Sequence, residues 1–160
     1  MGALSITFLW RKQRGFMQIN GLWYSSEDGI LRPVIRGEVL TGEGSWIKVP
    51  FLVDTGADRT VFSAAVLADL RLHTRATQER LGSVGGLVES VVVETQIRFS
   101  RETGNKVVFR SQYAAVTSNE ALDISVLGRD ITCLFAVIVD QPGNVVCLLS
   151  QRHRYTIEQS

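Results

Sequence analysis

Cysteine is scarce in this chain, with only Cys133 and Cys147 among 160 residues. Two cysteines are too few for a disulfide framework, and they do not have the short spacing of a metal site. If the turn at Pro142 and Gly143 closes a simple hairpin, Cys147 falls opposite Ile138 rather than opposite Cys133. The sequence therefore predicts no disulfide bond between the two cysteines and no metal site that contains them.

Long apolar runs and an excess of one charge are also missing. No stretch approaches the roughly 18 residues of a membrane span. The N-terminal segment ALSITFLW is short, lacks a cleavage-like site and carries its positive charges after it, which is not the pattern of a signal peptide. The 17 Lys and Arg residues nearly balance the 16 Asp and Glu residues, so nothing favours nucleic acid or a membrane as a partner.

His73 and His153 are isolated from other metal ligands, and we expect no metal or cofactor. A cytoplasmic location is the default expectation.

Apolar runs of strand-forming residues make up most of the chain. The hydrophobic share of 45% and the charged share of 21% suit one compact globular domain. Runs rich in Val, Ile, Phe and Leu, separated by turn residues, are typical of β-hairpins. The predicted hairpins span residues 33–53, 96–116 and 134–149. In the last of them, the first strand is expected over residues 134–139. The sequence thus predicts a mostly β protein.

One short helix is expected within this β pattern. Ser63 is a good N-cap residue and is followed by good helix formers, which predicts a helix over residues 63–72. A further helical turn is expected after Gly128. The start of the chain has weak patterning and is expected to be partly disordered. The predicted layout is an N-terminal extension, a folded domain and a tail, over residues 1–30, 31–150 and 151–160.

The segment FLVDTGADRTVF, residues 51–62, places an acidic residue between two apolar strands. By composition, Asp54, Thr55 and Gly56 form a turn. The strand pattern nevertheless resumes at Thr60, so the carboxylate lies at a tight bend between two segments that both look buried. Such a position is costly for a charged group. Asp54 is therefore the strongest candidate for a functional residue.

Three segments follow one another in an order that is typical of one enzyme family. They are Asp-Thr-Gly-Ala-Asp at 54–58, a glycine-rich hairpin at 82–87 and Val-Leu-Gly-Arg-Asp at 126–130. Together they resemble the retropepsin family, the single-lobed aspartic proteases of retroviruses and their cellular relatives. The resemblance covers roughly residues 33–149. It implies a closed or partly open acid-protease barrel, built as a single lobe with one or two short helices and a flap hairpin.

The chemistry implied by the resemblance needs two carboxyl groups. Peptide hydrolysis without a covalent intermediate uses one ionised carboxylate to take a proton from water and one protonated carboxyl to activate the carbonyl oxygen. Two carboxylates about 3 Å apart share one proton and titrate as a unit. This chain carries a single Asp-Thr-Gly motif. The resemblance therefore implies a homodimer with a two-fold axis through the site, acting as an endopeptidase on peptides or proteins.

The resemblance also assigns a role to each neighbour of Asp54. The catalytic turn would be Asp54 with Thr55 and Gly56. The Thr55 hydroxyl is expected to bond to the backbone of the partner copy, and the Gly56 amide is expected to bond the carboxylate. Asp58 is expected to meet the backbone of the substrate. Asp58 is also expected to form a partly buried ion pair with Arg129.

Other segments are expected to hold the substrate. The resemblance implies a flap at residues 82–87, with glycine hinges and a Val84 amide that contacts the substrate through a water molecule. Gly128 is expected to allow close approach of the backbone, and Asp130 to cap a helix. The residues expected to contact substrate are Ala57, Asp58, Gly82, Ser83, Val84, Gly85, Gly86, Ile124 and Val126.

Two hypotheses about function remain open at this stage. The expected lining of the cleft by Ile124, Val126, Val84 and Leu87 is apolar, so a protease should prefer bulky apolar side chains around the cut. The other hypothesis is a non-catalytic peptide-binding or assembly module on the same barrel. It is motivated by the C-terminal hairpin, because retroviral enzymes end soon after the Gly-Arg segment. A chain that stays monomeric would favour this second hypothesis, since one carboxylate cannot supply both acid and base.

Overall fold

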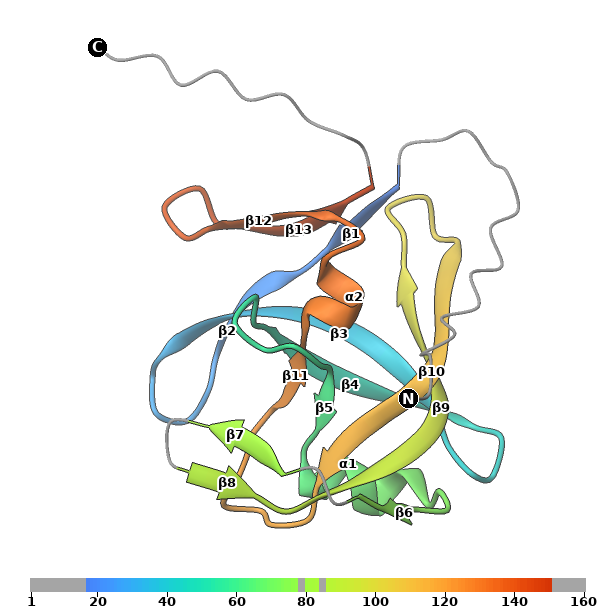
Figure 1. Cartoon of the computed structure of the whole chain (residues 1–160). Helices are drawn as coiled ribbons and strands as arrows, with labels where there is room; N and C mark the ends of the chain where they lie inside the picture. The colour runs from blue at the N-terminus through green and yellow to red at the C-terminus, as the bar shows by residue number, and fades with distance from the viewer. Residues whose placement is uncertain (1–16, 78–79, 84–85, 151–160) are drawn as a thin grey trace.

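The structure is a computed structural model that describes residues 17–77, 80–83 and 86–150. Most of these residues lie in β-strands, and the two helices are short (Figure 1). The helices are α1 (Ala64–Leu70) and α2 (Arg129–Thr132). The strands are β1 (Gln18–Asn20), β2 (Leu22–Ser25), β3 (Leu31–Leu40), β4 (Trp46–Val53), β5 (Val61–Phe62), β6 (Arg75–Ala76), β7 (Leu81–Ser83), β8 (Gly86–Val88), β9 (Ser90–Ser100), β10 (Lys106–Val116), β11 (Ser125–Leu127), β12 (Ala136–Asp140) and β13 (Val145–Leu149).

Six strands close into a barrel. The main sheet has the order β2-β3-β4-β11-β5-β10-β9-β6, and an additional pairing of β3 with β9 closes a ring from β3 through β4, β11, β5, β10 and β9. A closed ring leaves no free edge among these six strands, which is one way in which β proteins avoid edge-to-edge association. The predicted class, a mostly β single-lobed barrel with short helices, is confirmed.

The three predicted hairpins are present. Strands β3 and β4 pair around the turn at 41–45, and β9 pairs with β10 along its whole length. In the last hairpin, β12 pairs with β13, and Ile138 lies opposite Cys147 as the turn predicted. Both cysteines are free. The first strand of this hairpin is expected from residue 134 but begins at Ala136, because Leu134 and Phe135 still donate backbone hydrogen bonds into the turn that ends α2.

The start of the chain differs from the expectation. Residues 18–25, which the sequence places in an N-terminal extension, form β1 and β2. Strand β1 pairs with β13, where Ile19 lies opposite Leu148, and β2 pairs with β3. Ile19 is only 1% exposed. The folded body therefore includes this segment. Its hydrogen bonds and its burial come from strands that are distant in the sequence, so its own residue pattern does not indicate them. Residues 1–16 and 151–160 lie outside the described part of the chain.

The core contains a connected group of aromatic rings. The centroids of neighbouring rings lie 5.6 to 6.1 Å apart, and the rings are tilted or edge-on to one another. This geometry suits the charge distribution of aromatic rings. The rings belong to Phe51, Phe62, Phe99, Phe109 and Tyr113, each at most 4% exposed. Phe51 and Phe62 lie on the strands that enter and leave the Asp54 segment, so this packing anchors both ends of that segment.

Helix α1 covers one end of the barrel, below β5 and β10 in the view of Figure 1. Its N-cap is Ser63, as predicted, and the Ser63 hydroxyl accepts a hydrogen bond from the Val66 amide. The helix ends at Leu70, two residues before the predicted end, because Arg71 has a left-handed backbone with φ of 49°. Neither helix in the described ranges is long and apolar enough to cross a membrane.

Candidate active site

The Asp54 carboxylate lies at the end of β4, where the chain turns away from the sheet. The Asp54 amide donates to the Leu127 carbonyl at 3.2 Å, and the Gly56 amide donates to Asp54 Oδ1 at 2.8 Å. Asp54 is half-buried in the single chain, whereas Thr55 and Gly56 are exposed. The predicted bond from the Gly56 amide to the carboxylate is thus present. It fixes the orientation of the carboxylate and leaves the turn open on its outer side.

Strand β11 brings the Val-Leu-Gly segment beside Asp54. It runs parallel to β4 and antiparallel to β5, so it fills the space between the strands that enter and leave the Asp54 loop. Gly128 follows directly. A Cβ atom on Gly128 would lie 2.3 Å from both the carbonyl carbon and the carbonyl oxygen of Arg59. The backbone of the loop therefore packs against this glycine at a distance that no other residue type allows.

Arg129 connects the start of α2 to the Asp54 loop. Its guanidinium donates to the Thr55 carbonyl at 3.1 Å and pairs with the Asp58 carboxylate. Its backbone amide donates to the Ala57 carbonyl at 2.8 Å. The predicted pair of Asp58 and Arg129 is present. It is exposed rather than partly buried, with side chains 79% and 52% exposed in the single chain.

Asp130 is not a helix cap, contrary to the expectation. The N-cap of α2 is Gly128, and Asp130 lies inside the helix. Its carboxylate accepts hydrogen bonds from the Thr60 amide at 2.9 Å and from the Thr60 hydroxyl at 2.7 Å. The Thr60 hydroxyl in turn accepts a hydrogen bond from the Gly128 amide at 3.2 Å. Thr60 is fully buried. The pKa of the Tyr113 phenol lies well above its ordinary value. The main cause is burial of the phenol, and the negative charge of Asp130 adds to it.

Sequence reasoning missed Thr60 as a site residue. A signal was available, because Thr60 is a polar residue at the point where an apolar strand resumes, and a buried hydroxyl needs a partner. Asp130 supplies that partner from 70 residues further along the chain. The bonds between Thr60 and Asp130 hold the C-terminal end of the loop, whereas the bond between the Gly56 amide and Asp54 holds its N-terminal end.

The glycine-rich segment forms a hairpin, as predicted. Strands β7 and β8 pair antiparallel, with Gly82 opposite Leu87 and Ser83 opposite Gly86. Gly86 has φ of 119°, a conformation that favours glycine. The Leu87 side chain is 68% exposed. Val84 and Gly85 lie outside the described residues, so the predicted contact of the Val84 amide stays a prediction.

The base of this hairpin packs on a small apolar cluster. Leu81 and Val88 lie against three buried residues of the barrel, Val61, Ala114 and Val116. The rest of the hairpin has no strand partner outside itself within the described sheets. Apolar contacts at its base thus hold the hairpin against the barrel.

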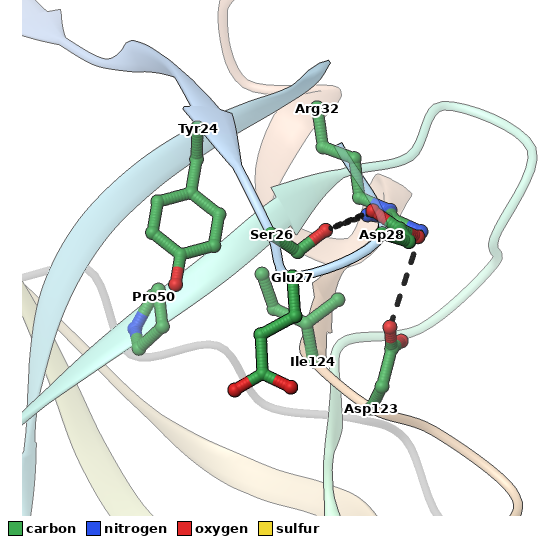
Figure 2. A pocket seen from close by; sticks show the side chains of 8 residues that line it. All are labelled: Tyr24, Ser26, Glu27, Asp28, Arg32, Pro50, Asp123 and Ile124. Atoms are coloured by element: carbon green, nitrogen blue, oxygen red, sulfur yellow. Dashed lines mark hydrogen bonds and ion pairs between the residues drawn. The ribbon is translucent and has the colours of Figure 1, made fainter. Parts of the chain in front are cut away.

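The two remaining candidates for substrate contact lie in different surroundings. Val126 pairs with Leu52 on one side and Val61 on the other, and it is 6% exposed, so the single chain leaves little of it for a substrate. Ile124 lies just before β11 and lines an open pocket of about 450 Å³ (Figure 2). The other lining residues are Tyr24, Ser26, Glu27, Asp28, Arg32, Pro50 and Asp123.

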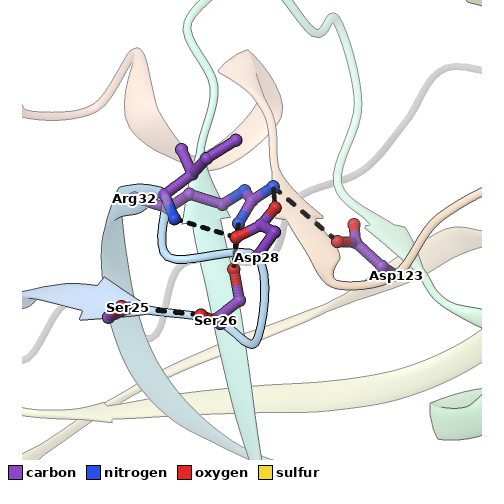
Figure 3. A network of polar contacts seen from close by, with 6 residues as sticks. Ser25, Ser26, Asp28, Arg32 and Asp123 are labelled. Atoms are coloured by element: carbon purple, nitrogen blue, oxygen red, sulfur yellow. Dashed lines mark hydrogen bonds and ion pairs between the residues drawn. The ribbon is translucent and has the colours of Figure 1, made fainter.

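A polar network forms one wall of this pocket (Figure 3). The Arg32 guanidinium contacts both carboxylate oxygens of Asp28, at 3.0 and 2.6 Å, and also bonds the Ser26 hydroxyl. Ser26 donates to Asp28 at 2.7 Å, and the Ile30 amide donates at 2.9 Å. These hydrogen bonds hold the pKa of Asp28 well below its ordinary value. The largest contribution comes from Arg32, followed by Ser26 and the Ile30 amide. Sequence reasoning did not find this network.

Comparison with known proteins places these features in a family. The family model described as "Aspartyl protease" matches residues 39–131, which include the Asp54 loop, the glycine-rich hairpin and β11. The chain therefore belongs to the aspartyl protease family. The closed barrel of this chain has a fold similar to that of a single-lobed, retropepsin-like aspartic protease. No curated protein matches the chain.

Two solved structures are similar in fold. One is a retropepsin-like aspartic protease from Rickettsia conorii, with a TM-score of 0.52, 18% identity, and coverage of 93% of this chain and 96% of that chain. The other is EIAV protease in complex with the inhibitor HBY-793, with a TM-score of 0.47, 24% identity, and coverage of 64% of this chain and 86% of that chain. The first likeness extends over nearly the whole of both chains and supports the barrel assignment.

Proposed function

We propose that the chain is an aspartic endopeptidase that acts as a homodimer, with one Asp54 from each copy in the active site. The observation that carries the proposal is the position of Asp54. Its carboxylate lies at a bend that is bonded to β11 and held by the Gly56 amide, with an exposed outer side. Family membership supports a protease, and the single Asp-Thr-Gly motif supports the need for a second copy.

The proposed reaction uses one proton shared between the two Asp54 carboxyls. The ionised carboxylate takes a proton from a water molecule as the water oxygen attacks the peptide carbonyl carbon. The protonated carboxyl gives its proton to the carbonyl oxygen, which forms a neutral tetrahedral diol. In the second step the carboxyl that took the water proton gives it to the leaving nitrogen, the other carboxylate takes a proton from a diol hydroxyl, and the C–N bond breaks. The products are a carboxylic acid and an amine, and the dyad again holds one proton.

The neighbours of Asp54 would hold this geometry. Thr55 is exposed beside the carboxylate and would contact the loop of the partner copy. The ion pair of Arg129 with Asp58, and the bond from Arg129 to the Thr55 carbonyl, would keep that loop in one conformation. A small displacement of reacting groups can cost a large factor in rate, so a braced loop serves catalysis directly. In the dimer, Asp58 would remain available for the backbone of a peptide substrate.

The test is cleavage of a diverse peptide mixture at mildly acidic to neutral pH, read by mass spectrometry. We expect Asp54→Asn to lower cleavage at least about 1000-fold, because the dyad can no longer act as acid and base. Asp69→Asn is the matched control, since Asp69 is an exposed carboxylate on α1 and should leave cleavage unchanged. Sedimentation velocity on both variants would verify that fold and association are kept. Undiminished cleavage by Asp54→Asn would refute the proposal, and peptide binding without cleavage would favour the non-catalytic module.

A further inference from the structure

The pocket in front of Ile124 has an apolar side and an acidic side (Figure 2). Tyr24 on β2, Pro50 on β4 and Ile124 before β11 supply the apolar side. The acidic side comes from Glu27 and Asp28, in the turn between β2 and β3, and from Asp123. Three segments that are far apart in the sequence thus meet around one cavity of about 450 Å³.

The charges around this pocket do not cancel. Three carboxylates line it, and Arg32 is the one cation among its lining residues. Arg32 is committed to Asp28 through two hydrogen bonds. Arg32 also forms an ion pair with Asp123, whose 4.0 Å distance is too long for a hydrogen bond, and the Asp123 side chain is 75% exposed. In the described part of the chain, Glu27 has no hydrogen bond or ion pair. Asp123 and Glu27 therefore leave the pocket with a formal charge of about −2 at neutral pH.

The pocket lies close enough to Asp54 for one extended peptide to reach both. Pro50 is four residues before Asp54 on β4, and Ile124 is four residues before Gly128 on the neighbouring parallel segment. A strand rises about 3.3 Å per residue, so Pro50 lies at most about 13 Å from Asp54. An extended substrate covers that distance in about four residues. A side chain within about four residues of the cut bond can therefore occupy the pocket.

An apolar wall with carboxylates at its rim matches one kind of side chain. Lysine and arginine lay their methylene stems along apolar surface and keep the charged head at a polar edge. The ring of Tyr24 offers a further favourable contact to a cation. An acidic side chain would meet Asp123 and Glu27 with like charge, and a purely apolar one would offer neither carboxylate an opposite charge.

We propose that this pocket binds a lysine or arginine side chain of the substrate, within about four residues of the cut bond. The proposal rests on the proposed protease function and adds a charge preference to it. It complements the apolar preference expected directly around the cut, because the two preferences concern different positions of the peptide. Asp123 and Glu27 would set the preference, and the Arg32 pair with Asp28 would hold the turn that carries Glu27.

The first test compares peptides that share an apolar core at the cut and differ at one position. Lys, Arg, Gln and Glu are placed in turn at each of the first four positions on either side of the cut, and kcat/KM is measured. We expect a preference of about three- to fivefold for Lys or Arg over Gln at one position, and discrimination against Glu there, the magnitude expected for partly exposed ion pairs. The preference should shrink as salt is raised from about 0.05 to about 0.5 M, because salt screens exposed charges. Equal kcat/KM for all four peptides at every position would overturn the proposal.

Variants then assign the preference to this pocket. In Asp123→Asn combined with Glu27→Gln, the ratio of kcat/KM for Lys over Gln should fall towards one, and in Asp123→Lys the preference should turn towards Glu. Asp69→Asn removes an exposed carboxylate of the same type on α1, away from the pocket lining, and should keep the ratio of the wild type. A ratio that is unchanged in the double variant would place the preference elsewhere and refute the assignment.

A binding measurement separates this proposal from the proposed function. Fluorescence anisotropy with labelled Lys, Gln and Glu peptides is carried out on Asp54→Asn and on the wild type. If the wild type cleaves nothing but binds the Lys peptide more tightly than the other two, the protease proposal fails and the pocket proposal stands. If cleavage occurs with no charge preference, the pocket proposal fails and the protease proposal stands. An absence of both cleavage and selective binding refutes both.

Discussion

The Asp54 loop, residues 54–60, and the hairpin of β7 and β8, which is the flap of the proposed protease, are held by the fold in different ways. The loop is tied to β11 and α2 by three backbone hydrogen bonds, from Asp54 to Leu127, from Arg129 to Ala57 and from Asp130 to Asp58. The bonds of Thr60 with Asp130 close its far end. The hairpin forms a sheet of two strands only, anchored through Leu81 and Val88.

This difference predicts two kinds of motion. A segment with many buried bonds to the barrel opens only when the barrel unfolds, whereas a segment with few outside contacts opens by itself. The proposed protease would use both, since its carboxylate would stay in position while the hairpin admits the substrate. In that enzyme, rigidity and access would come from separate segments of the chain.

The largest effect is expected for Gly128→Ala. The added Cβ would lie 2.3 Å from the Arg59 backbone, which cannot move without displacing the loop. We expect the free energy of unfolding, measured by urea denaturation, to fall by about 3 kcal/mol. Cleavage should fall with it, even under conditions where the variant remains folded.

The matched control for Gly128→Ala is Gly82→Ala in the flap. A Cβ at Gly82 would meet no atom within 4 Å. The change in unfolding free energy should therefore stay within about 0.5 kcal/mol. Equal losses in the two variants would show that the loop and the flap are not held differently, and the comparison would fail.

Asp130→Ala should have the next largest effect. It leaves the buried Thr60 amide and hydroxyl without their acceptor. Loss of hydrogen bonds to a charged group lowers the free energy of unfolding by about 2 kcal/mol. Calorimetry or urea denaturation measures this, and Asp130→Asn, which keeps one acceptor oxygen, should lose less. Asp69→Ala, at an exposed position on α1, should lose almost nothing. If Asp130→Ala lowered the free energy of unfolding no more than Asp69→Ala, the bonds between Asp130 and Thr60 would not be what holds the C-terminal end of the loop.

The smallest effect concerns Glu38, on the wall of the barrel away from both segments. Hydrogen bonds from Arg98 and then from Lys106 lower the pKa of Glu38 from about 4.5 to about 2. A depressed pKa in the folded state means that the stabilisation is present above pH 4.5 and is lost as the pH falls towards 2. Because Glu38 and its two partners are partly exposed, we expect the free energy of unfolding to fall by about 1 kcal/mol over this pH range. Urea denaturation between these pH values measures the loss, which Glu38→Gln should reduce.

Glu38→Gln also tests, at a fixed pH, whether the Asp54 loop and the flap open in different ways. It destabilises the barrel without touching the loop or the flap. Hydrogen exchange should then become faster for amides of the Asp54 loop, whose opening requires global unfolding, and should stay unchanged for β7 and β8. A uniform acceleration in both segments would mean that the flap also opens only with the whole domain.

The sequence allowed much of the fold to be predicted, for local reasons. Hairpins are set by alternation and by turns within short stretches, so β3 with β4 and β9 with β10 follow from neighbouring residues. The position of Ile138 opposite Cys147 follows from the turn alone. The Asp54 turn was visible because a charge between two apolar strands is unusual in a short window. The resemblance to retropepsins added the order of the three segments.

The parts that could not be predicted depend on contacts between distant residues. Strand β1 is stable because β13 lies beside it, and no feature of residues 18–20 indicates that partner. Thr60 meets Asp130, and Glu27 meets Asp123 around one pocket, only after β11 has entered between β4 and β5. The gathering of three carboxylates around the pocket beside Ile124 depends on the same contacts between distant segments.

The hairpins, the helix that begins after Ser63 and the Asp-Thr-Gly turn can be read from the amino-acid sequence, because backbone propensity, turn chemistry and apolar patterning act over a few residues. The bonds that hold the Asp54 loop, the packing of the hairpin of β7 and β8 on the barrel and the charges that gather near Ile124 follow only from the tertiary structure. Those features depend on closing the barrel, which brings residues 70 or more positions apart into hydrogen-bond contact, and no local pattern specifies such a contact.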